Sequence, residues 1–341
     1  MTMSNFIEVI DSIFKVAFGD TLEPDDSVFE SLSLAAESGD TEFFRQLVEA
    51  ESAKIRRKDQ PTLLYSAVSV GKETVVKALI EAGADVHAKI EMFFTFDALE
   101  TAIDKGFINI VKMLLDAGAD PNWNNASPGL ACVTKAVQKG YADILRLLLE
   151  RGASVKFGTG FRLLVEAAQK STPEIVQLLI EAGCNVNTRD YQEDTPLTVA
   201  CKRANVEIVR VLIAAGANVN KTGMHEYTPL ISLLYAEKLN KMLSSHGLAE
   251  KLADIEERVL EISKMLINAG ADVNCLDSHH GTTPLMMAVQ RNNIELVKFL
   301  IASNANVNMI SQPDPKSLFV GQVKCTNALQ LAIQQNLPEI V

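Results

Sequence analysis

The stretch Gly216-Ala217-Asn218-Val219-Asn220 is one of seven copies of a short phrase, and the regular return of this phrase decides the fold. The copies occupy residues 83–87, 118–122, 152–156, 183–187, 216–220, 270–274 and 304–308. Their first residues lie 35, 34, 31, 33, 54 and 34 positions apart. A repeat of about 33 residues is typical of a solenoid, in which each unit buries its apolar face only against its neighbours.

One period, from Thr195 to Asn220, reads as two helices followed by a turn. Thr195 is an N-cap residue, and Pro196 stands in the first turn, where its missing N–H has no helical partner to lose. A second helix is predicted over residues 207–215, and Gly216 ends it because glycine adopts the left-handed conformation at low cost. The residues after it form an extended finger with a turn, so the sequence predicts an all-α solenoid of about nine such units.

The openings of the first helices resemble those of the ankyrin-repeat family. The family pattern Thr-Pro-Leu-His-x-Ala is matched, except at its His, by Thr195-Pro196-Leu197-Thr198-Val199-Ala200, Thr228-Pro229-Leu230 and Thr283-Pro284-Leu285-Met286-Met287-Ala288. The resemblance covers about residues 27–341 and implies an ankyrin-repeat solenoid of stacked helix-turn-helix units with β-turn fingers. Because the family's His is absent from every copy, we expect the bonds between neighbouring fingers to differ from those of the family.

The two ends of the chain depart from the repeat. Residues 1–26 are expected to form an apolar helix that caps the repeat domain, residues 27–341. The alternatives are that this helix binds a partner or a membrane surface. The scarcity of Lys and Arg in residues 1–26 argues against the membrane. At Pro338–Val341 the second helix of the last repeat has only begun. Either the chain is part of something longer, or a partner covers that end.

The 54-residue step contains an insertion of about 21 residues, at about residues 236–257. Apolar residues at helical spacing, among them Leu239, Leu248 and Ile255, predict that both helices of this repeat are lengthened into a protruding hairpin. The apolar stripe either holds the hairpin together or docks a partner.

Composition favours a soluble intracellular protein. The net charge is −11, hydrophobic residues make up 48% of the chain, and no apolar run approaches the ~20 residues of a membrane-spanning helix. The N-terminus lacks the basic start of a signal peptide, and a disulfide framework is not indicated by the five cysteines. We therefore expect a cytoplasmic location, with a secreted effector acting in a host cytosol as the alternative.

The sequence contains few of the residue patterns that catalysis requires. His279 and His280 are adjacent rather than four residues apart, which disfavours a shared metal ion. No phosphate-binding loop and no Ser-His-Asp or Cys-His set can be assembled. We therefore expect no enzyme activity, no cofactor, no metal and no small-molecule substrate.

Basic residues recur at one position of the repeat, between the paired alanines of the first helix and the following turn. In the ankyrin family this position faces the concave groove. It is occupied by Lys105, Lys139, Lys170, Arg203 and Arg291, and Lys135 and Lys202 lie on the same face. With stacked helices ~10 Å apart, these residues would form a basic ladder in an acidic protein, which indicates an acidic peptide or protein partner. The alternative is that long charged side chains solvate the helix ends. The net charge of −11 argues against nucleic acid.

The finger between His87 and Asp97 carries an unusual set of large apolar residues. They are Met92, Phe93, Phe94 and Phe96, and Trp123 lies at the base of the next finger. Finger tips usually face solvent. These side chains therefore either pack on neighbouring fingers or form an exposed anchor for a partner.

Three functions remain open. The first, which we favour, is a scaffold that grips a partner protein in the concave groove. The second is a targeting arm of a larger enzyme. The third is a substrate of an asparaginyl hydroxylase, because the resemblance extends to Leu and an acidic residue eight and two positions before Asn274 and His87.

Overall fold

The computed structural model describes residues 34, 46–48, 63–87, 90–91, 95–122, 132–155, 160–235, 249–311 and 326–341. The expected capping helix at 1–26 lies outside the described residues, as do Met92, Phe93, Phe94, Trp123 and residues 236–248. The chain divides into two compact units, Met1–Ser154 and Val155–Val341, which we call unit 1 and unit 2.

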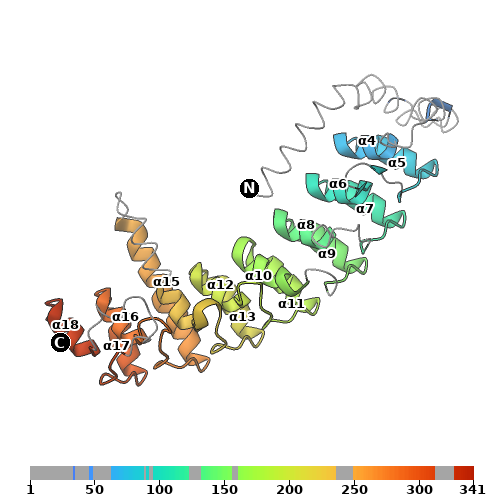
Figure 1. Ribbon diagram of the computed structural model, residues 1–341. Coiled ribbons are helices and arrows are strands. Elements are labelled where there is room, and N and C mark those ends of the chain that lie inside the picture. The colour runs from blue at the N-terminus through green and yellow to red at the C-terminus, as the bar shows by residue number, and fades with distance from the viewer. Residues whose placement is uncertain are drawn as a thin grey trace. The chain divides into compact units, whose positions relative to one another are not determined.

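Unit 1 contains three described pairs of helices, each pair joined by a short turn (Figure 1). The pairs are α4 (Leu63–Val70) with α5 (Glu73–Glu81), α6 (Ala98–Lys105) with α7 (Ile108–Asp116), and α8 (Cys132–Lys139) with α9 (Ala142–Glu150). The first helices of successive pairs pack on one another, and so do the second helices. We call them inner and outer helices. The finger after α5 holds two short antiparallel strands, β1 (Ile90–Glu91) and β2 (Thr95–Phe96), with Ile90 opposite Phe96.

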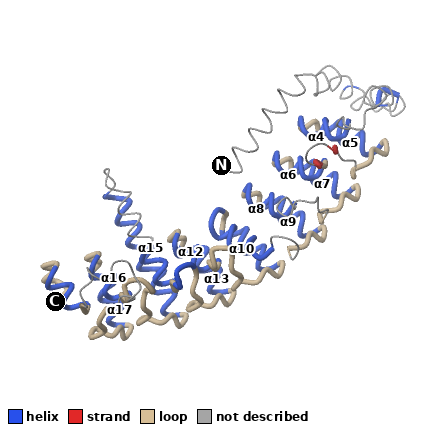
Figure 2. The backbone as a smooth tube through the Cα atoms, in the orientation of Figure 1, coloured by secondary structure: helices blue, strands red, loops and turns tan. Residues whose placement is uncertain are grey.

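Unit 2 continues the same plan. Its pairs are α10 (Gly160–Lys170) with α11 (Pro173–Glu181), α12 (Pro196–Lys202) with α13 (Val206–Ala214), helical residues 229–235 with α15 (Ala249–Asn268), and α16 (Pro284–Gln290) with α17 (Ile294–Ala302), followed by α18 (Ala328–Gln334). A 3₁₀ turn, η2 (Met224–Glu226), lies in one finger. In Figure 2 the loops that form the fingers run along one edge of this unit.

Local signals account for these boundaries. Thr195 accepts a hydrogen bond from the backbone of Thr198 in a capping box, and Pro196 opens α12, as predicted. The following helix begins at Val206, one residue earlier than expected, because the Asn205 side chain caps it by accepting from Ile208 N. The predicted all-α repeat architecture is confirmed.

The core of each repeat is built from small and branched apolar residues. In the α12–α13 pair, Ala200, Ile208 and Leu212 are at most 1% exposed. Burying a side chain such as Leu212 contributes about 1.5–3 kcal/mol. Cys132 and Cys201 are also buried, and burial raises the pKa of both thiols, so they pack as small apolar groups.

The outer helix α15 differs from its neighbours. It has 20 residues, whereas α13 and α17 have 9 each. At 1.5 Å per residue its length is about 30 Å, against about 14 Å for either neighbour. Figure 1 shows its N-terminal part extending beyond the adjacent helices. Its C-terminal part packs between them, with Arg210 of α13 bonded to Glu261 at 2.8 Å. Among the described helices, none is both long enough and apolar enough to span a bilayer.

Candidate interaction surfaces of the fingers and inner helices

Neighbouring fingers are joined by asparagine side chains. The Asn220 amide donates to Gly270 O at 2.9 Å, and its oxygen accepts from Asp272 N at 2.8 Å. Asn122 makes the same two bonds to the next finger in unit 1, and Asn187 makes them in unit 2. The last residue of the repeated phrase therefore supplies bonds between fingers in a chain that lacks the family's His.

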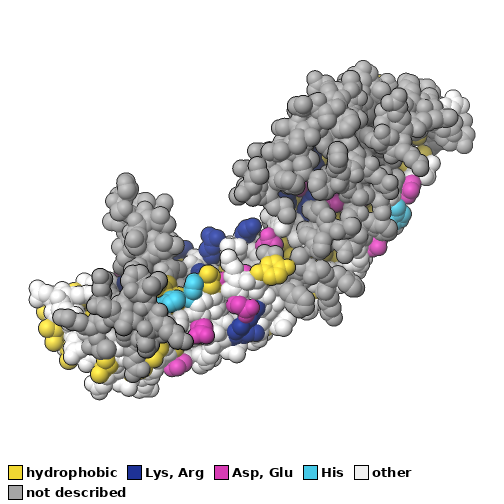
Figure 3. Space-filling model, viewed as in Figure 1, with side chains coloured by type: hydrophobic (Ala, Val, Ile, Leu, Met, Phe, Trp, Pro, Cys, Tyr) yellow, Lys and Arg dark blue, Asp and Glu magenta, His cyan; other side chains and the backbone are white. Residues whose placement is uncertain are grey.

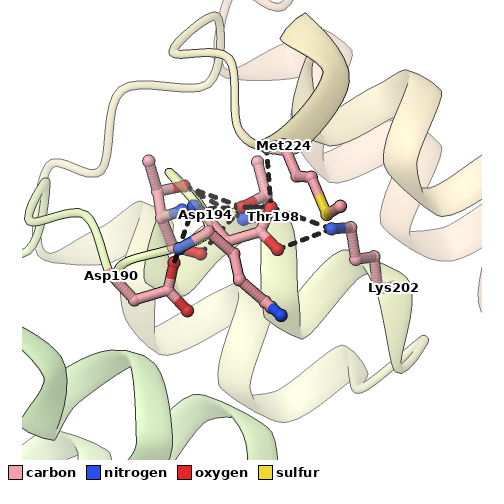
Figure 4. A network of polar contacts seen from close by, with 7 residues as sticks. Asp190, Asp194, Thr198, Lys202 and Met224 are labelled. Carbon is pink, nitrogen blue, oxygen red and sulfur yellow. Dashed lines mark hydrogen bonds and ion pairs between the residues drawn. The ribbon is translucent and has the colours of Figure 1, made fainter.

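A buried carboxylate connects two fingers of unit 2 (Figure 4). Asp194 is 3% exposed and precedes the cap of α12. Its oxygens accept from Lys202 Nζ at 2.6 and 2.8 Å and from Met224 N of the next finger at 3.0 Å. Thr198 Oγ1 donates to the same carboxylate at 3.3 Å. The charge of Asp194 is thus balanced by a lysine, and each of its two oxygens accepts at least one hydrogen bond.

Gly223 is required where the next finger approaches this carboxylate. A Cβ atom added at Gly223 would overlap Asp194 Oδ1, and it would also lie 2.9 Å from Thr198 Oγ1. The neighbouring backbone N–H of Met224 can donate to Asp194 only because this space is open. A side chain at residue 223 must therefore displace the finger or the carboxylate.

Three of the predicted ladder residues lie in unit 1. Lys135 lies 3.1 Å from Glu100 and 3.6 Å from Asp104, and Lys139 lies 3.1 Å from Asp104. Glu100 is buried, which raises the pKa of its carboxyl despite the opposing charge of Lys135. Lys135 and Lys139 therefore join two successive inner helices. Lys105 is exposed and makes no ion pair with any described residue.

The other ladder residues lie in unit 2. Lys170 is 58% exposed and lies 3.5 Å from Glu166, whereas the Lys202 side chain is directed to buried Asp194. Arg203 is exposed and forms no ion pair within the described part of the chain. Arg291 donates to the backbone carbonyls of Leu234 and Met287, and so links the helical segment 229–235 to α16. At the repeated position, some cationic side chains are therefore exposed to solvent, whereas others bind groups of neighbouring helices.

The predicted finger aromatics are only partly within the described structure. Phe96 lies in β2, of which the backbone is described. Met92, Phe93, Phe94 and Trp123 lie outside the described residues. Whether these side chains are exposed stays a prediction.

The structure also brings together five aromatic residues that the sequence analysis did not connect. His225 and Tyr227 come from one finger, Tyr235 from the adjoining inner helix, and His279 and His280 from the next finger. We call this set the His–Tyr cluster. Figure 3 shows imidazoles gathered beside a hydrophobic patch on unit 2.

Stacking and hydrogen bonds hold the cluster together. The rings of Tyr227 and Tyr235 stack with centroids 4.7 Å apart and planes 3° apart. Tyr235 Oη lies 3.1 Å from His280 Nδ1, and the rings of His225 and His279 lie 5.2 Å apart. Burial and the nearby charge of Asp277 raise the pKa of the Tyr235 hydroxyl, so it stays protonated.

Asp277 lies behind the cluster with a side chain that is fully buried. It accepts from the backbone N–H groups of His279, His280 and Thr282 at 2.8–2.9 Å, and from the Thr282 hydroxyl. Burial alone would raise the pKa of this carboxyl, but the bonds from Thr282 and the backbone outweigh it and lower the pKa. Asp277 is therefore a buried anion. A comparison of this finger with residues 190–195 would have indicated the position, because Asp190 accepts in the same way from Gln192 N and Asp194 N.

The described residues contain no group of three or more His, Cys, Asp or Glu side chains arranged to hold a metal ion. The chemistry that these surfaces offer is recognition by charge, ring faces and hydrogen bonds.

A family model described as ankyrin repeats (3 copies) matches the chain over residues 32–125, 99–190, 133–223, 164–248 and 252–341. These matches extend through both units. No curated protein matches the chain.

Proposed function

This chain belongs to the ankyrin-repeat family, whose repeats are generally modules of protein–protein interaction, and we propose that it is a scaffold that binds a partner protein on its inner helices and fingers. The fold alone does not identify a partner, so the proposal depends on the chemistry of particular residues.

The repeated cationic position at the ends of the inner helices supports this proposal best. Lys105 and Lys139 occupy it in unit 1, and Lys170 and Arg203 occupy it in unit 2. All four side chains are exposed, and neither Lys105 nor Arg203 is neutralised by an acid in the described structure. We assign to each of these two pairs, within its own unit, the binding of an acidic segment of the partner. Lys135, Lys202 and Arg291 mainly serve the fold through the bonds described above.

Two further assignments follow from the same reasoning. We assign a second contact to the finger that carries Met92, Phe93, Phe94 and Phe96, together with Trp123, because large apolar side chains dominate binding energy in interfaces. We also assign a protein rather than a nucleic acid as the partner, since a net charge of −11 repels phosphate. A cytoplasmic location suits the free thiols of Cys132, Cys184, Cys201 and Cys275.

The test is a charge reversal with a matched control. Lys105, Lys139, Lys170 and Arg203 are changed together to Glu, and in a second protein Lys77, Lys112, Lys264 and Lys298 of the outer helices are changed to Glu. Both proteins carry the same change in net charge. A partner captured with the unmodified protein should bind the inner-helix variant at least about tenfold more weakly at low salt, and this difference should shrink as salt screens the charges.

The control should bind the same partner within about twofold of the unmodified protein, because exposed charges outside an interface contribute little. Equal binding by the two variants would exclude the inner helices as the electrostatic site. Substitution of Phe93, Phe94 and Phe96 by Ser tests the finger separately. It should weaken binding while the melting temperature stays nearly unchanged.

A further inference from the structure

We propose that the His–Tyr cluster of unit 2 is the binding site for an arginine side chain of the partner protein. This inference rests on the proposed scaffold function, and it names a second point of contact with chemistry opposite to that of the inner-helix cations. All residues that carry it belong to two adjacent fingers and one inner helix of the same unit.

The cluster presents ring surface to the solvent. His225 and His279 are exposed, and the His280 side chain is 42% exposed. Tyr227 is half-buried beside His225 and His279, with its ring centroid 5.7 Å from the centroid of each imidazole. Aromatic faces attract cations through their quadrupole, and arginine is the cation most often found on them.

The charge behind the rings favours a cation as well. Asp277 is ionised and buried, and within the described residues its only ion-pair neighbour is His280, with Nδ1 at 3.5 Å. The buried Asp194 shows the alternative, since Lys202 lies 2.6 Å from it. Exposed Glu226 stands between His225 and Tyr227 in the chain and adds a second carboxylate. The negative charge of Asp277 is therefore less completely balanced than that of Asp194.

The acceptors at the surface select a guanidinium over an ammonium. A neutral imidazole has one ring nitrogen with a free lone pair, and the phenolic oxygens of Tyr227 and Tyr235 also accept hydrogen bonds. A planar guanidinium can stack on a ring and donate to several acceptors in its plane, whereas an ammonium is a compact, strongly hydrated point charge. A carboxylate or phosphate ligand would be repelled by Asp277 and Glu226.

The site is also organised before a ligand arrives. The Ser278 hydroxyl donates to His225 O, which joins the two fingers directly. The stacked Tyr227 and Tyr235 join the finger to its inner helix, and Asp277 orders the second finger through four hydrogen bonds. A side chain that binds here therefore orders few protein groups, which favours binding.

The direct test uses the full chain and a blocked tripeptide, acetyl-Gly-Arg-Gly-amide, at pH 7.5. Imidazole signals of the protein labelled at histidine are followed by NMR during titration. We expect saturable shifts of the His225 and His279 signals. The same tripeptide with citrulline, which keeps the shape of arginine without its charge, should bind at least about tenfold more weakly, and the lysine tripeptide should lie between them.

Variants connect the binding to this site. Tyr227→Leu should abolish the saturable shift, and Glu226→Gln, at an exposed residue, should weaken binding without affecting the fold. Asp277→Asn should weaken peptide binding further, provided that circular dichroism shows that the variant keeps the fold. Glu193→Gln removes one charge from the preceding finger and should leave binding unchanged. Equal affinity for the arginine and citrulline peptides, or equal binding by the Glu226→Gln and Glu193→Gln proteins, would overturn the proposal.

The two proposals fail in different ways. If Tyr227→Leu leaves the affinity for the captured partner unchanged while the inner-helix charge reversal lowers it, the scaffold function stands and the arginine site is wrong. If both the charge reversal and Tyr227→Leu leave partner binding unchanged, the inner helices and the cluster are both excluded.

Discussion

Two fingers of unit 2 each contain a buried aspartate, and the charge is balanced differently in the two. Asp194 is bonded to Lys202 at 2.6 Å and to the backbone of the next finger, so the charge is neutralised inside the fold. Asp277 is held by three backbone N–H groups and a hydroxyl, with only His280 as an ion-pair neighbour among the described residues. The first arrangement joins repeats together, whereas the second leaves an electrostatic field at the surface. A buried aspartate in a finger can thus serve stability or recognition according to its counter-charge.

The largest effect should come from removing the lysine. Lys202→Met leaves the Asp194 carboxylate buried without a cation. Breaking the pair in this way should lower the free energy of unfolding by about 2–4 kcal/mol. The cost is smaller than for a fully buried pair because the Lys202 side chain is one-third exposed. Urea unfolding followed by circular dichroism measures the loss. The control is Lys170→Met. Lys170 is exposed and pairs with Glu166 near the surface, so this substitution should cost at most about 0.5 kcal/mol. Equal losses in the two proteins would contradict the contrast.

Gly223→Ala should have the next largest effect. The added methyl group overlaps Asp194 Oδ1 and must displace the finger, which should cost about 1–3 kcal/mol. Because this substitution and Lys202→Met act on one carboxylate, their combined effect should be smaller than the sum. Gly216→Ala is the control. Its added methyl group meets no atom within 4 Å, so its cost comes only from the left-handed backbone at this residue. Its effect on stability should therefore add fully to that of Lys202→Met. Additivity in both double variants would show that the steric contact is unimportant.

Asp277→Asn should produce a smaller effect that depends on pH. The amide cannot accept all the hydrogen bonds that the carboxylate accepts, so the variant should be about 1–2 kcal/mol less stable at pH 7. The folded-state pKa of Asp277 is lowered, so its contribution is present above the unfolded value of about 3.9 and is lost as pH falls through the folded pKa. The stability of the two proteins should therefore converge in acid. A constant difference from pH 7 to pH 3 would show that the charge of Asp277 plays no part.

The smallest effect is expected at the edge of the His–Tyr cluster. Tyr235→Phe removes the hydroxyl that lies 3.1 Å from His280 Nδ1 but keeps the ring stacked on Tyr227. Because the His280 side chain is partly exposed, water can replace the lost bond, and the cost should be about 0.5 kcal/mol. Thermal unfolding of the variant and of the unmodified protein measures this cost. A loss above 2 kcal/mol would assign the hydroxyl to the core of the fold.

Much of the fold was predictable because its signals are local. A Thr-Pro pair caps a helix, as at Thr195 and Thr283, and a glycine with positive φ ends the next one, as at Gly216. These features depend on a few adjacent residues, and the period then repeats them. The one-residue shift at Val206 arose from the Asn205 cap, which is also local.

The surfaces were less predictable because their partners are distant in sequence. The repeat indicates where Lys135 and Lys202 stand, but the acids that bind them lie on the preceding inner helix and at the start of the same helix. Tyr235 and His280 are 45 residues apart and are brought together by packing across the insertion. A spacing pattern reports the position of a side chain along a helix, and the direction of a long, flexible side chain depends on the charges that surround it.

The asparagine bonds between fingers have a mechanical consequence. In unit 2, Asn187, Asn220 and Asn274 each bond to the finger that follows, so these links are arranged in series along the edge of the stack. A force that pulls the ends of this unit apart would load every link equally, and the weakest would open first without loosening the others. Extension should then proceed in discrete steps of about one repeat each, and on relaxation each repeat would find its neighbour still folded as a template. The unit would lengthen and recover under load, as a spring does, rather than rupture in a single event.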